Sequence, residues 1–240
     1  SKNSFSCSDI GPNTITINSV DANGNTGTCT ALVTIVDTIN PLVICKDTTL
    51  YLNALGSIGI DTSFVYVSSI DNCSIDTIFV SKDTFSCIDL GTQPIQIYAV
   101  DRSGNIDSCT ANITVIDTIK PTLVCKDTTV YLDASGNATI DSSYIIQTLT
   151  DNCLVSHTIL SNTIFGCSDT GINLVSIIAY DASGNLDSCT ARIRIADTVA
   201  PIAICQNITI SLNSSGMASI TPADLDGGST GNCSVASITL

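Results

Sequence analysis

An 80-residue repeat with fixed cysteine positions constrains this chain more than any other feature of its sequence. The stretch CTALVTIVDTINPLVIC at 29–45 returns as CTANITVIDTIKPTLVC at 109–125 and as CTARIRIADTVAPIAIC at 189–205, without insertion or deletion. Because this period covers all 240 residues, it overrides the expectation of one or two larger domains. Counting from the prolines of the Asp-Thr-x-x-Pro joints, we expect the C-terminal half of a repeat at 1–40, complete repeats at 41–120 and 121–200, and the N-terminal half of a repeat at 201–240.

Residues within a repeat alternate between apolar and polar with the period of a β-strand. From Cys109 to Val115 the odd positions are apolar and the even positions are Thr or Asn. A period of two with one apolar face is typical of a half-buried strand. The apolar segments at 130–132 and 138–140 flank a turn sequence and predict a local hairpin. No helical period continues for three turns. We therefore expect an all-β fold of tandem Ig-like β-sandwich domains of 80 residues, arranged end to end through short joints that proline stiffens.

Twelve cysteines, four in each repeat, predict a disulfide framework. A domain of this size has a modest core and gains from cross-links. Structural zinc usually requires cysteines two to four residues apart together with histidines, whereas no two cysteines here are that close and His157 is the only histidine. Disulfides place the chain in an oxidising, extracytoplasmic compartment. The residues alone leave three pairings of four cysteines open.

The charge and hydropathy of the chain exclude several classes of partner. The net charge is −14, and all 22 acidic residues are Asp. Only eight Lys and Arg are present, which argues against nucleic acid. No apolar run of about 18 residues exists, so we expect no membrane insertion. No signal peptide is present either. Since the cysteines imply export, we expect this chain to be a piece of a longer exported protein.

Catalysis finds little support in the sequence. With one histidine there is no repeated pair of nucleophile and base, and His157 takes the position of Thr77 and Ser237 in the other repeats. Paired carboxylates can serve glycoside hydrolysis, but here they recur along an array instead of forming one cleft. The absence of Trp weakens a sugar-stacking function. We therefore expect no enzyme activity and no catalytic residues.

The motif Asp-x-x-Gly-Asn at 21–25, 101–105 and 181–185 offers a candidate metal site. Its carboxylate and amide oxygens suit Ca²⁺, which takes six to eight oxygen ligands. The alternative is a tight turn in which Asp caps the backbone and Gly or Asn adopts a positive φ. No Glu closes a loop, so the EF-hand pattern is absent. Calcium is the only cofactor that we expect, and the turn without calcium stays open beside it.

The combined pattern resembles a known family. DxxGN-x3-CTA-x-(V/I)-x-(V/I)-x-DT-x2-P-x3-C, with DNC and F-x-C between successive joints, resembles the hyalin repeat (HYR) and related bacterial Ig-like modules. It is most similar to the tandem arrays of giant secreted surface proteins of Bacteroidota, including gliding-type adhesins. The third copy departs from the pattern, because Gln206-Asn207 replaces Lys-Asp after the joint and Gly231 stands where Asp71 begins DNC. Those Asp positions therefore have no role that every copy shares.

The resemblance implies a nested disulfide pattern. The cysteine after the joint proline would pair with the cysteine after DxxGN, giving Cys45–Cys109 and Cys125–Cys189. The remaining pairs would then be Cys73–Cys87 and Cys153–Cys167. This pattern leaves four cysteines for bonds to the next segment, with Cys205 meeting the position of Cys29 and Cys233 meeting the position of Cys7.

The resemblance also implies candidate ligand and modification sites. In some related arrays the Asp of DxxGN and the Asp of the joint share a calcium ion. By that analogy the metal ligands would be Asp21, Asn25, Asp37, Asp101, Asn105, Asp117, Asp181, Asn185 and Asp197. Asp-Thr followed by an apolar residue or Thr resembles the O-glycosylation signal of Bacteroidota, with an ordinary Thr in a strand or turn as the alternative. This signal occurs at Thr38, Thr48, Thr77, Thr118, Thr128 and Thr198.

The function implied by the resemblance is that of a structural segment in an extracellular bacterial surface filament or adhesin stalk. Its partners would be copies of itself, head to tail along a fibre. The alternatives are an adhesive module that binds glycans or surfaces directly, and an accessory part of a secreted enzyme. One outward position holds Leu32, Asn112 and Arg192 in turn, and this drift favours a stalk over an adhesive face. For the two half-repeats we expect completion either by a covalent chain that runs on, which we favour, or by strand donation between subunits.

Overall fold

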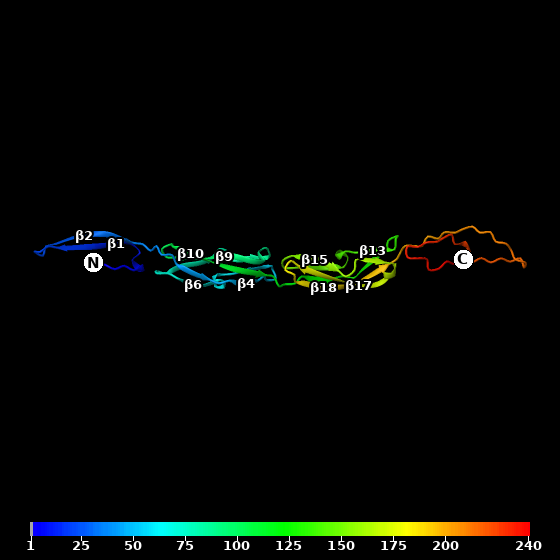
Figure 1. Ribbon diagram of the computed structural model, residues 1–240, viewed down its shortest axis with the longest axis horizontal. Helices are drawn as coiled ribbons and strands as arrows, with labels where there is room; N and C mark the ends of the chain where they lie inside the picture. Colours follow the sequence, from blue (N-terminus) through cyan, green and yellow to red (C-terminus); the bar gives the residue numbers. More distant parts are fainter. Residues whose placement is uncertain (1) are drawn as a thin grey trace. The chain divides into compact units, whose positions relative to one another are not determined.

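The computed structural model describes residues 2–240, which form two compact units, Ser1–Thr118 and Ile119–Leu240. The first unit contains a β-hairpin followed by a β-sandwich. The second unit contains a sandwich with the same strand order, followed by a segment with little regular structure (Figure 1). Both sandwiches are all-β and Ig-like, as the alternating pattern predicts. No helix within residues 2–240 has the length and apolar character needed to cross a membrane.

The hairpin of the first unit consists of β1 (Gly11–Val20) and β2 (Thr26–Ile35), paired antiparallel over their whole length. It follows the short 3₁₀ helix η1 (Cys7–Asp9). The turn between the two strands is the first DxxGN motif, in which Gly24 has a φ of +88°. A side chain is strained at such a φ, so the glycine is required at the tip.

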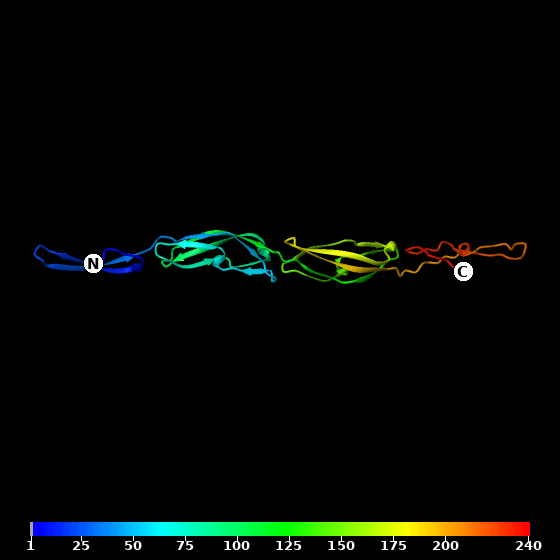
Figure 2. The ribbon, with the colours of Figure 1, turned by 90° about the horizontal axis from the view of Figure 1, so that it is seen from below.

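The sandwich of the first unit has a four-stranded sheet on one side and two short strand pairs on the other. The large sheet has the order β4 (Thr48–Tyr51), β10 (Ile106–Ile116), β9 (Gly91–Asp101) and β7 (Ile75–Val80), in which β4 runs parallel to β10. The opposite layer contains β3 (Leu42–Cys45) paired with β6 (Tyr66–Ile70), and β5 (Ser57–Gly59) paired with β8 (Thr84–Ser86). Figure 2 shows the strands of this sandwich in its two layers. The 3₁₀ helices η2 (Thr62–Phe64) and η3 (Cys87–Asp89) join strands.

The core lies between these layers and uses the inward positions that the period of two predicts. Ala111 and Ile113 of β10 are completely buried, as is Ile97 of β9. Phe85 of β8 fills the centre from the opposite layer with no exposed surface. Burying an aromatic or branched aliphatic side chain stabilises a fold by about 1.5–3 kcal/mol, so this alternating row is the main source of stability.

The second unit repeats this architecture. Its large sheet has the order β12 (Thr128–Tyr131), β18 (Leu186–Ala196), β17 (Gly171–Asp181) and β15 (Val155–Leu160). The other layer pairs β11 (Thr122–Cys125) with β14 (Ile146–Thr150), and β13 (Asn137–Thr139) with β16 (Ile164–Gly166). The 3₁₀ helices are η4 (Ser142–Tyr144) and η5 (Cys167–Asp169). The register of β17 on β18, with Ile177 opposite Cys189, equals that of Ile97 opposite Cys109.

Residues 201–240 form few regular elements. Two isolated bridges join Ile202 to Thr230 and Cys205 to Asp226. A single helical turn, α1 (Pro222–Leu225), follows Thr221. Among residues 201–220 every side chain is exposed, so this segment has no core of its own.

The hairpin predicted around 133–137 is wrong. The turn itself exists, because the Asp133 carbonyl accepts hydrogen bonds from Gly136 N and Asp133 N donates to the Asn137 carbonyl. The two flanking strands diverge, however, since β12 pairs with β18 and β13 pairs with β16. Each strand gains a partner in a different layer, and burial in a two-layer core outweighs local pairing.

Candidate metal centre and disulfide links between repeats

The DxxGN motif forms the same tight turn three times. At the end of β9, Asp101 Oδ1 accepts hydrogen bonds from the backbone N–H groups of Ser103 and Asn105, both at 2.8 Å, and Oδ2 accepts from Asn105 Nδ2 at 2.7 Å. The motifs headed by Asp21 and Asp181 make the same bonds. The turn chemistry is therefore present in every copy, and the side-chain amide of each Asn supports the turn as a donor.

Asp101 is only 2% exposed. Burial raises the pKa of its carboxyl, but hydrogen bonds from the side chain and backbone of Asn105 and from the backbone of Ser103 outweigh this effect and hold the pKa below its usual value. Asp101 is therefore ionised at neutral pH despite its burial.

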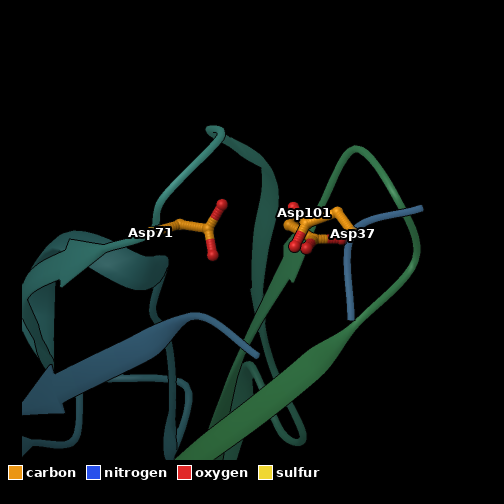
Figure 3. A group of neighbouring side chains, drawn as sticks. All are labelled: Asp37, Asp71 and Asp101. Carbon is orange, nitrogen blue, oxygen red and sulfur yellow. The ribbon is translucent and has the colours of Figure 1, made fainter. Parts of the chain in front are cut away.

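Three carboxylates converge beside the first joint, from three different segments (Figure 3). Asp37 lies in the joint after β2, Asp71 begins the DNC turn between β6 and β7, and Asp101 ends β9. Their nearest oxygens all lie within 4.8 Å of one another. The structure thus brings together Asp37 and Asp101, which the resemblance implied as ligands, and adds Asp71. The signal that could have found Asp71 is the DNC motif itself, which stands one strand before DxxGN in both complete repeats.

Two oxygens in this group are buried without a hydrogen-bond partner. Asp37 Oδ1 accepts from Ile39 N and from Asn72 Nδ2, whereas its Oδ2 has no partner. Asp71 Oδ2 accepts from the N–H groups of Cys73 and Ser74, whereas its Oδ1 has no partner. Two ionised groups at this separation repel each other by about 3 kcal/mol at an effective dielectric constant of about 20. Buried, orphaned, mutually repelling oxygens are the donor set that a hard cation requires.

The other sequence-predicted ligands are distributed unequally. Asp21 and Asn25 lie at the exposed tip of the β1–β2 hairpin, away from the Asp37 group. Asp117 belongs to the first unit, and Asp181 and Asn185 belong to the second. In the second unit Asp151 repeats the geometry of Asp71, with Oδ2 accepting two backbone N–H groups and Oδ1 buried without a partner.

The third joint is held by a hydrogen bond instead of by clustered charges. Asp197 Oδ1 accepts from Asn232 Nδ2 at 2.8 Å and from Val199 N at 3.0 Å. Gly231 supplies no carboxylate at the position of Asp71. The acidic group of the first joint is therefore not reproduced here.

One disulfide crosses between the two layers of each sandwich. The structure joins Cys45 of β3 to Cys109 of β10, with Cα atoms 6.0 Å apart, and Cys125 to Cys189, with Cα atoms 5.8 Å apart. These are the pairs that the resemblance implied. Each bond closes a loop of 64 residues and ties the first strand of the sandwich to the last.

The predicted pairs Cys73–Cys87 and Cys153–Cys167 are wrong. Cys73 is bonded to Cys7, and Cys167 is bonded to Cys233, each with a sequence separation of 66 and Cα atoms 5.3 Å apart. The expectation that Cys233 and Cys7 wait for another segment is wrong for the same reason. These two bonds link F-x-C of one repeat to DNC or GNC of the next.

Strand length explains this correction. The DNC turn precedes β7, whose first residue pairs with the last residue of β9, whereas Cys87 lies just before the first residue of β9. Because β9 has 11 residues, Cys73 and Cys87 lie at opposite ends of a strand roughly 35 Å long. A disulfide requires Cα atoms within about 7 Å. Cys87 and Cys153 are also in disulfides, whereas Cys29 and Cys205 are free and exposed.

Gly136 shows how closely the link packs in the second unit. It lies in the turn after β12 with a φ of +76°, and a Cβ built on it would come within 2.6 Å of Cys167 Sγ and 2.7 Å of the Asn232 carbonyl oxygen. Asn232 Nδ2 in turn donates to the Asp133 carbonyl at 3.2 Å. The turn of one repeat and the GNC turn of the next thus meet without space for a side chain.

The Asp-Thr sites differ in accessibility. Thr48 and Thr128 are half-buried within β4 and β12. The exposed members are Thr38, Thr77, Thr118 and Thr198. His157 is exposed on β15 and stacks on Tyr180 with ring centroids 4.8 Å apart, which agrees with a surface strand residue.

Comparison with known proteins places these features in a family context. No protein-family model matches the chain. Hyalin of Strongylocentrotus purpuratus is 31% identical over 219 residues, covering 84% of this chain and 18% of hyalin. The chain is hyalin-repeat-like. A protein of Acholeplasma phage L2 called "Uncharacterized 81.3 kDa protein" is 27% identical over 205 residues, covering 77% of this chain and 27% of that protein. The chain thus spans about a fifth to a quarter of the length of these relatives.

Similar solved structures include mouse clustered PcdhgC3 EC1-3 and the fibronectin(III)-like modules of Clostridium thermocellum CbhA. The first is 15% identical with a TM-score of 0.33, covering 78% of this chain and 77% of that one. The second is 12% identical with a TM-score of 0.26, covering 65% and 95%. Similarity at this level decides neither topology nor function. The hyalin relationship, together with the disulfides, marks the hyalin-repeat-like chain as a disulfide-rich β-domain protein of extracellular type.

Proposed function

We propose that this hyalin-repeat-like chain is a non-catalytic structural segment of a bacterial cell-surface filament or adhesin stalk. The observation that carries the proposal is the pair of disulfides, Cys7–Cys73 and Cys167–Cys233, that bond consecutive repeats. A single backbone joint lets two domains swivel. A second covalent connection several residues away restricts that rotation, so load and direction pass from one repeat to the next.

The joint itself supports the same function. Its proline is buried at Pro41 and at Pro121, and proline fixes φ at the entry to the next strand. In the first unit Asn105 Nδ2 donates to the Asp37 carbonyl at 3.1 Å, which fastens the joint to the DxxGN turn. A joint anchored on both sides transmits bending instead of absorbing it.

Variation on the outer face favours a stalk over an adhesive surface. Leu32 is 69% exposed, and the corresponding Asn112 and Arg192 are also exposed. The corresponding inward positions, Ile113 and Ile193, are identical and completely buried. An array that binds one ligand along its length needs a repeated outer face, whereas a stalk needs only a repeated core. The exposed Asp-Thr sites remain candidates for O-glycans on such a stalk.

A direct test compares the flexibility of the chain with and without the links between repeats. In the C7S/C73S/C167S/C233S variant, electron micrographs should show a wider distribution of angles between repeats than in the unchanged protein. The matched control, C45S/C109S/C125S/C189S, removes the same number of disulfides within sandwiches and should leave the angles unchanged. Equal distributions for the first variant and the unchanged protein would contradict a stiffening role.

We also propose that Asp37, Asp71 and Asp101 hold a Ca²⁺ ion that stiffens the first joint. The two buried oxygens without partners fit such an ion, and the ion would cancel the repulsion within the group. When bound, calcium supplies electrostatic bridging between a joint residue and two turns. The protein residues hold the three carboxylates in place through their backbone hydrogen bonds.

Asp71→Asn tests this site, because Asn keeps one oxygen for the N–H groups of Cys73 and Ser74 but removes the charge. We expect Ca²⁺ to raise the thermal unfolding temperature of the unchanged protein and calcium affinity measured by calorimetry to fall by at least about tenfold in the variant. The control Asp76→Asn changes an exposed carboxylate with no role in the group. Equal affinity in both variants would remove Asp71 from the site.

A further inference from the structure

We propose that residues 2–36 of one copy and residues 202–240 of a second copy of this chain complete one β-sandwich, closed by a disulfide between Cys29 and Cys205. This inference rests on the proposed stalk function and deepens it by naming the partner. It follows from two unpartnered apolar surfaces whose equivalents in the complete sandwiches cover each other.

The first surface is the inward face of the β1–β2 hairpin. Its register places Ile17 opposite Cys29, as Ile97 lies opposite Cys109 in the complete sandwich. The hairpin is therefore already folded as the last two strands of a sandwich. Ile17 is nevertheless 55% exposed, whereas Ile97 is completely buried. The hairpin lacks the layer that would cover this row.

The second surface lies on residues 201–240. Ile210 and Leu212 are 49% and 68% exposed. One repeat earlier, the same positions hold Val130 and Leu132, which are 7% and 3% exposed because they pack against the core row of β17 and β18. This segment therefore carries the apolar residues that a hairpin such as β1–β2 needs, in the sequence order that the complete sandwiches use.

The pairing register is fixed by the complete sandwiches. Strand β4 lies parallel to β10 with Thr48 beside Ile113, and β12 lies parallel to β18 with Thr128 beside Ile193. The equivalent contact joins residues 208–211 of one copy to residues 33–36 of another. In both complete cases an Asp oxygen just before the parallel strand accepts from a backbone N–H, at 2.7 Å from Asn112 to Asp47 and at 2.8 Å from Arg192 to Asp127. Asn207 stands at this position, and its side-chain oxygen can accept the same bond.

The two free thiols are the covalent counterpart of this fit. Cys205 corresponds to Cys45 and Cys125, and Cys29 corresponds to Cys109 and Cys189, which are the bonded partners within the complete sandwiches. With glutathione disulfide as the oxidant, the two thiols form one S–S bond and lose two protons and two electrons. The oxidant is reduced to two molecules of glutathione. The contact uses different surfaces on the two copies, so it is head to tail and can extend.

A mixing experiment with two single variants of the full chain tests the proposal. C29S retains only Cys205, and C205S retains only Cys29. After oxidation with glutathione disulfide, the 1:1 mixture should give a covalent dimer of twice 24.9 kDa on non-reducing gels, with a Cys29–Cys205 peptide in mass spectrometry. Each variant alone should give no covalent dimer, and the unchanged chain should give a ladder of higher multimers.

The apolar fit is tested separately with both cysteines intact. I210D/L212D should lose the ladder, whereas S211D should retain it, because the outward positions of Tyr51 and Tyr131 are exposed in the complete sandwiches. Peptide mapping of Cys167–Cys233 shows whether each variant has folded.

A chain that stays monomeric under oxidising conditions would overturn the inference, as would equal dimer yields from the mixture and from either variant alone. With Cys7–Cys73 and Cys167–Cys233 intact, that result would leave the stalk function standing. Unchanged angles in the micrograph test would contradict the function itself.

Discussion

Removing the two disulfides of the first unit is expected to have a strongly non-additive effect on how far the chain extends under force. Consider a pull between the N-terminus and Thr118, an exposed residue at the end of this unit. The bonds Cys7–Cys73 and Cys45–Cys109 interlock along the sequence, since Cys45 lies inside the loop closed by the first and Cys73 inside the loop closed by the second. The unfolded chain extends only as far as its shortest covalent path allows.

The lengths follow from the residue numbers. With both bonds intact, the shortest path from Cys7 to Cys109 crosses to Cys73, follows 28 residues back to Cys45, and crosses to Cys109. Without Cys45–Cys109 the path has 36 residues, without Cys7–Cys73 it has 38, and without both it has 102. At about 3.5 Å per extended residue, each single loss adds roughly 30 Å and the double loss adds roughly 260 Å.

Optical tweezers can measure these lengths on the full chain, with one handle at the N-terminus and another on a click-reactive amino acid that replaces Thr118. The four proteins are the unchanged chain, C7S/C73S, C45S/C109S and the quadruple variant, pulled without reductant. A gain near 260 Å in C45S/C109S alone would refute the reasoning, because it would mean that Cys7–Cys73 does not form. A quadruple variant that extended no further than the single-bond variants would refute it equally.

Two further predictions concern the second unit. Gly136→Ala should shift the glutathione equilibrium of Cys167–Cys233 toward the reduced form, since overpacking of this kind costs about 1–3 kcal/mol; Gly216→Ala is the matched control, with a similar φ of +72° but nothing within 4 Å, and equal shifts in both variants would contradict the contact. The second prediction is pH-dependent: hydrogen bonds from Leu123 N and Lys120 Nζ hold the pKa of Asp187 below its usual value, so its stabilisation is present above about pH 5 and is lost as the pH falls through the lowered pKa. Asp187→Asn should therefore lower the urea midpoint at pH 7 more than at about pH 2, and a constant difference between the proteins would contradict this assignment.

The sandwich and its inner face could be predicted from the sequence because they depend on local periodicity. The alternation from Cys109 to Val115 identifies the side that is buried, and the structure buries Ala111, Ile113 and Val115. The strict 80-residue spacing makes each repeat a check on the others. A period of two determines the facing of a strand, but it does not determine the neighbour of that strand. The parallel pairing of β12 with β18 joins residues some 65 positions apart, and no turn signal marks it.

The links between repeats could not be predicted for a related reason. Motif spacing within one repeat does not say at which end of the sandwich a turn lies. Once β9 is known to run for 11 residues between F-x-C and DxxGN, Cys73 and Cys87 are separated by its whole length. The same placement brings the DNC turn beside DxxGN and so adds Asp71 to the acidic group. The cysteine bonds and the acidic group therefore both depend on strand length, which the pattern alone leaves uncertain by several residues.

The two joints that lie inside a compact unit differ in charge and agree in covalent structure, which separates the functions of these two features. The first joint places three carboxylates together, with Asn72 Nδ2 3.1 Å from Asp37 Oδ1. The third joint replaces Asp71 with Gly231 and keeps only the amide contact, at 2.8 Å from Asn232 to Asp197. Both joints nevertheless have a disulfide of the same separation between F-x-C and the following turn. Since the disulfide persists where the acidic group is lost, connection of the repeats does not depend on a cation. A cation at the first joint would then adjust the stiffness of a connection that is already covalent, and joints along one array would differ in their response to calcium.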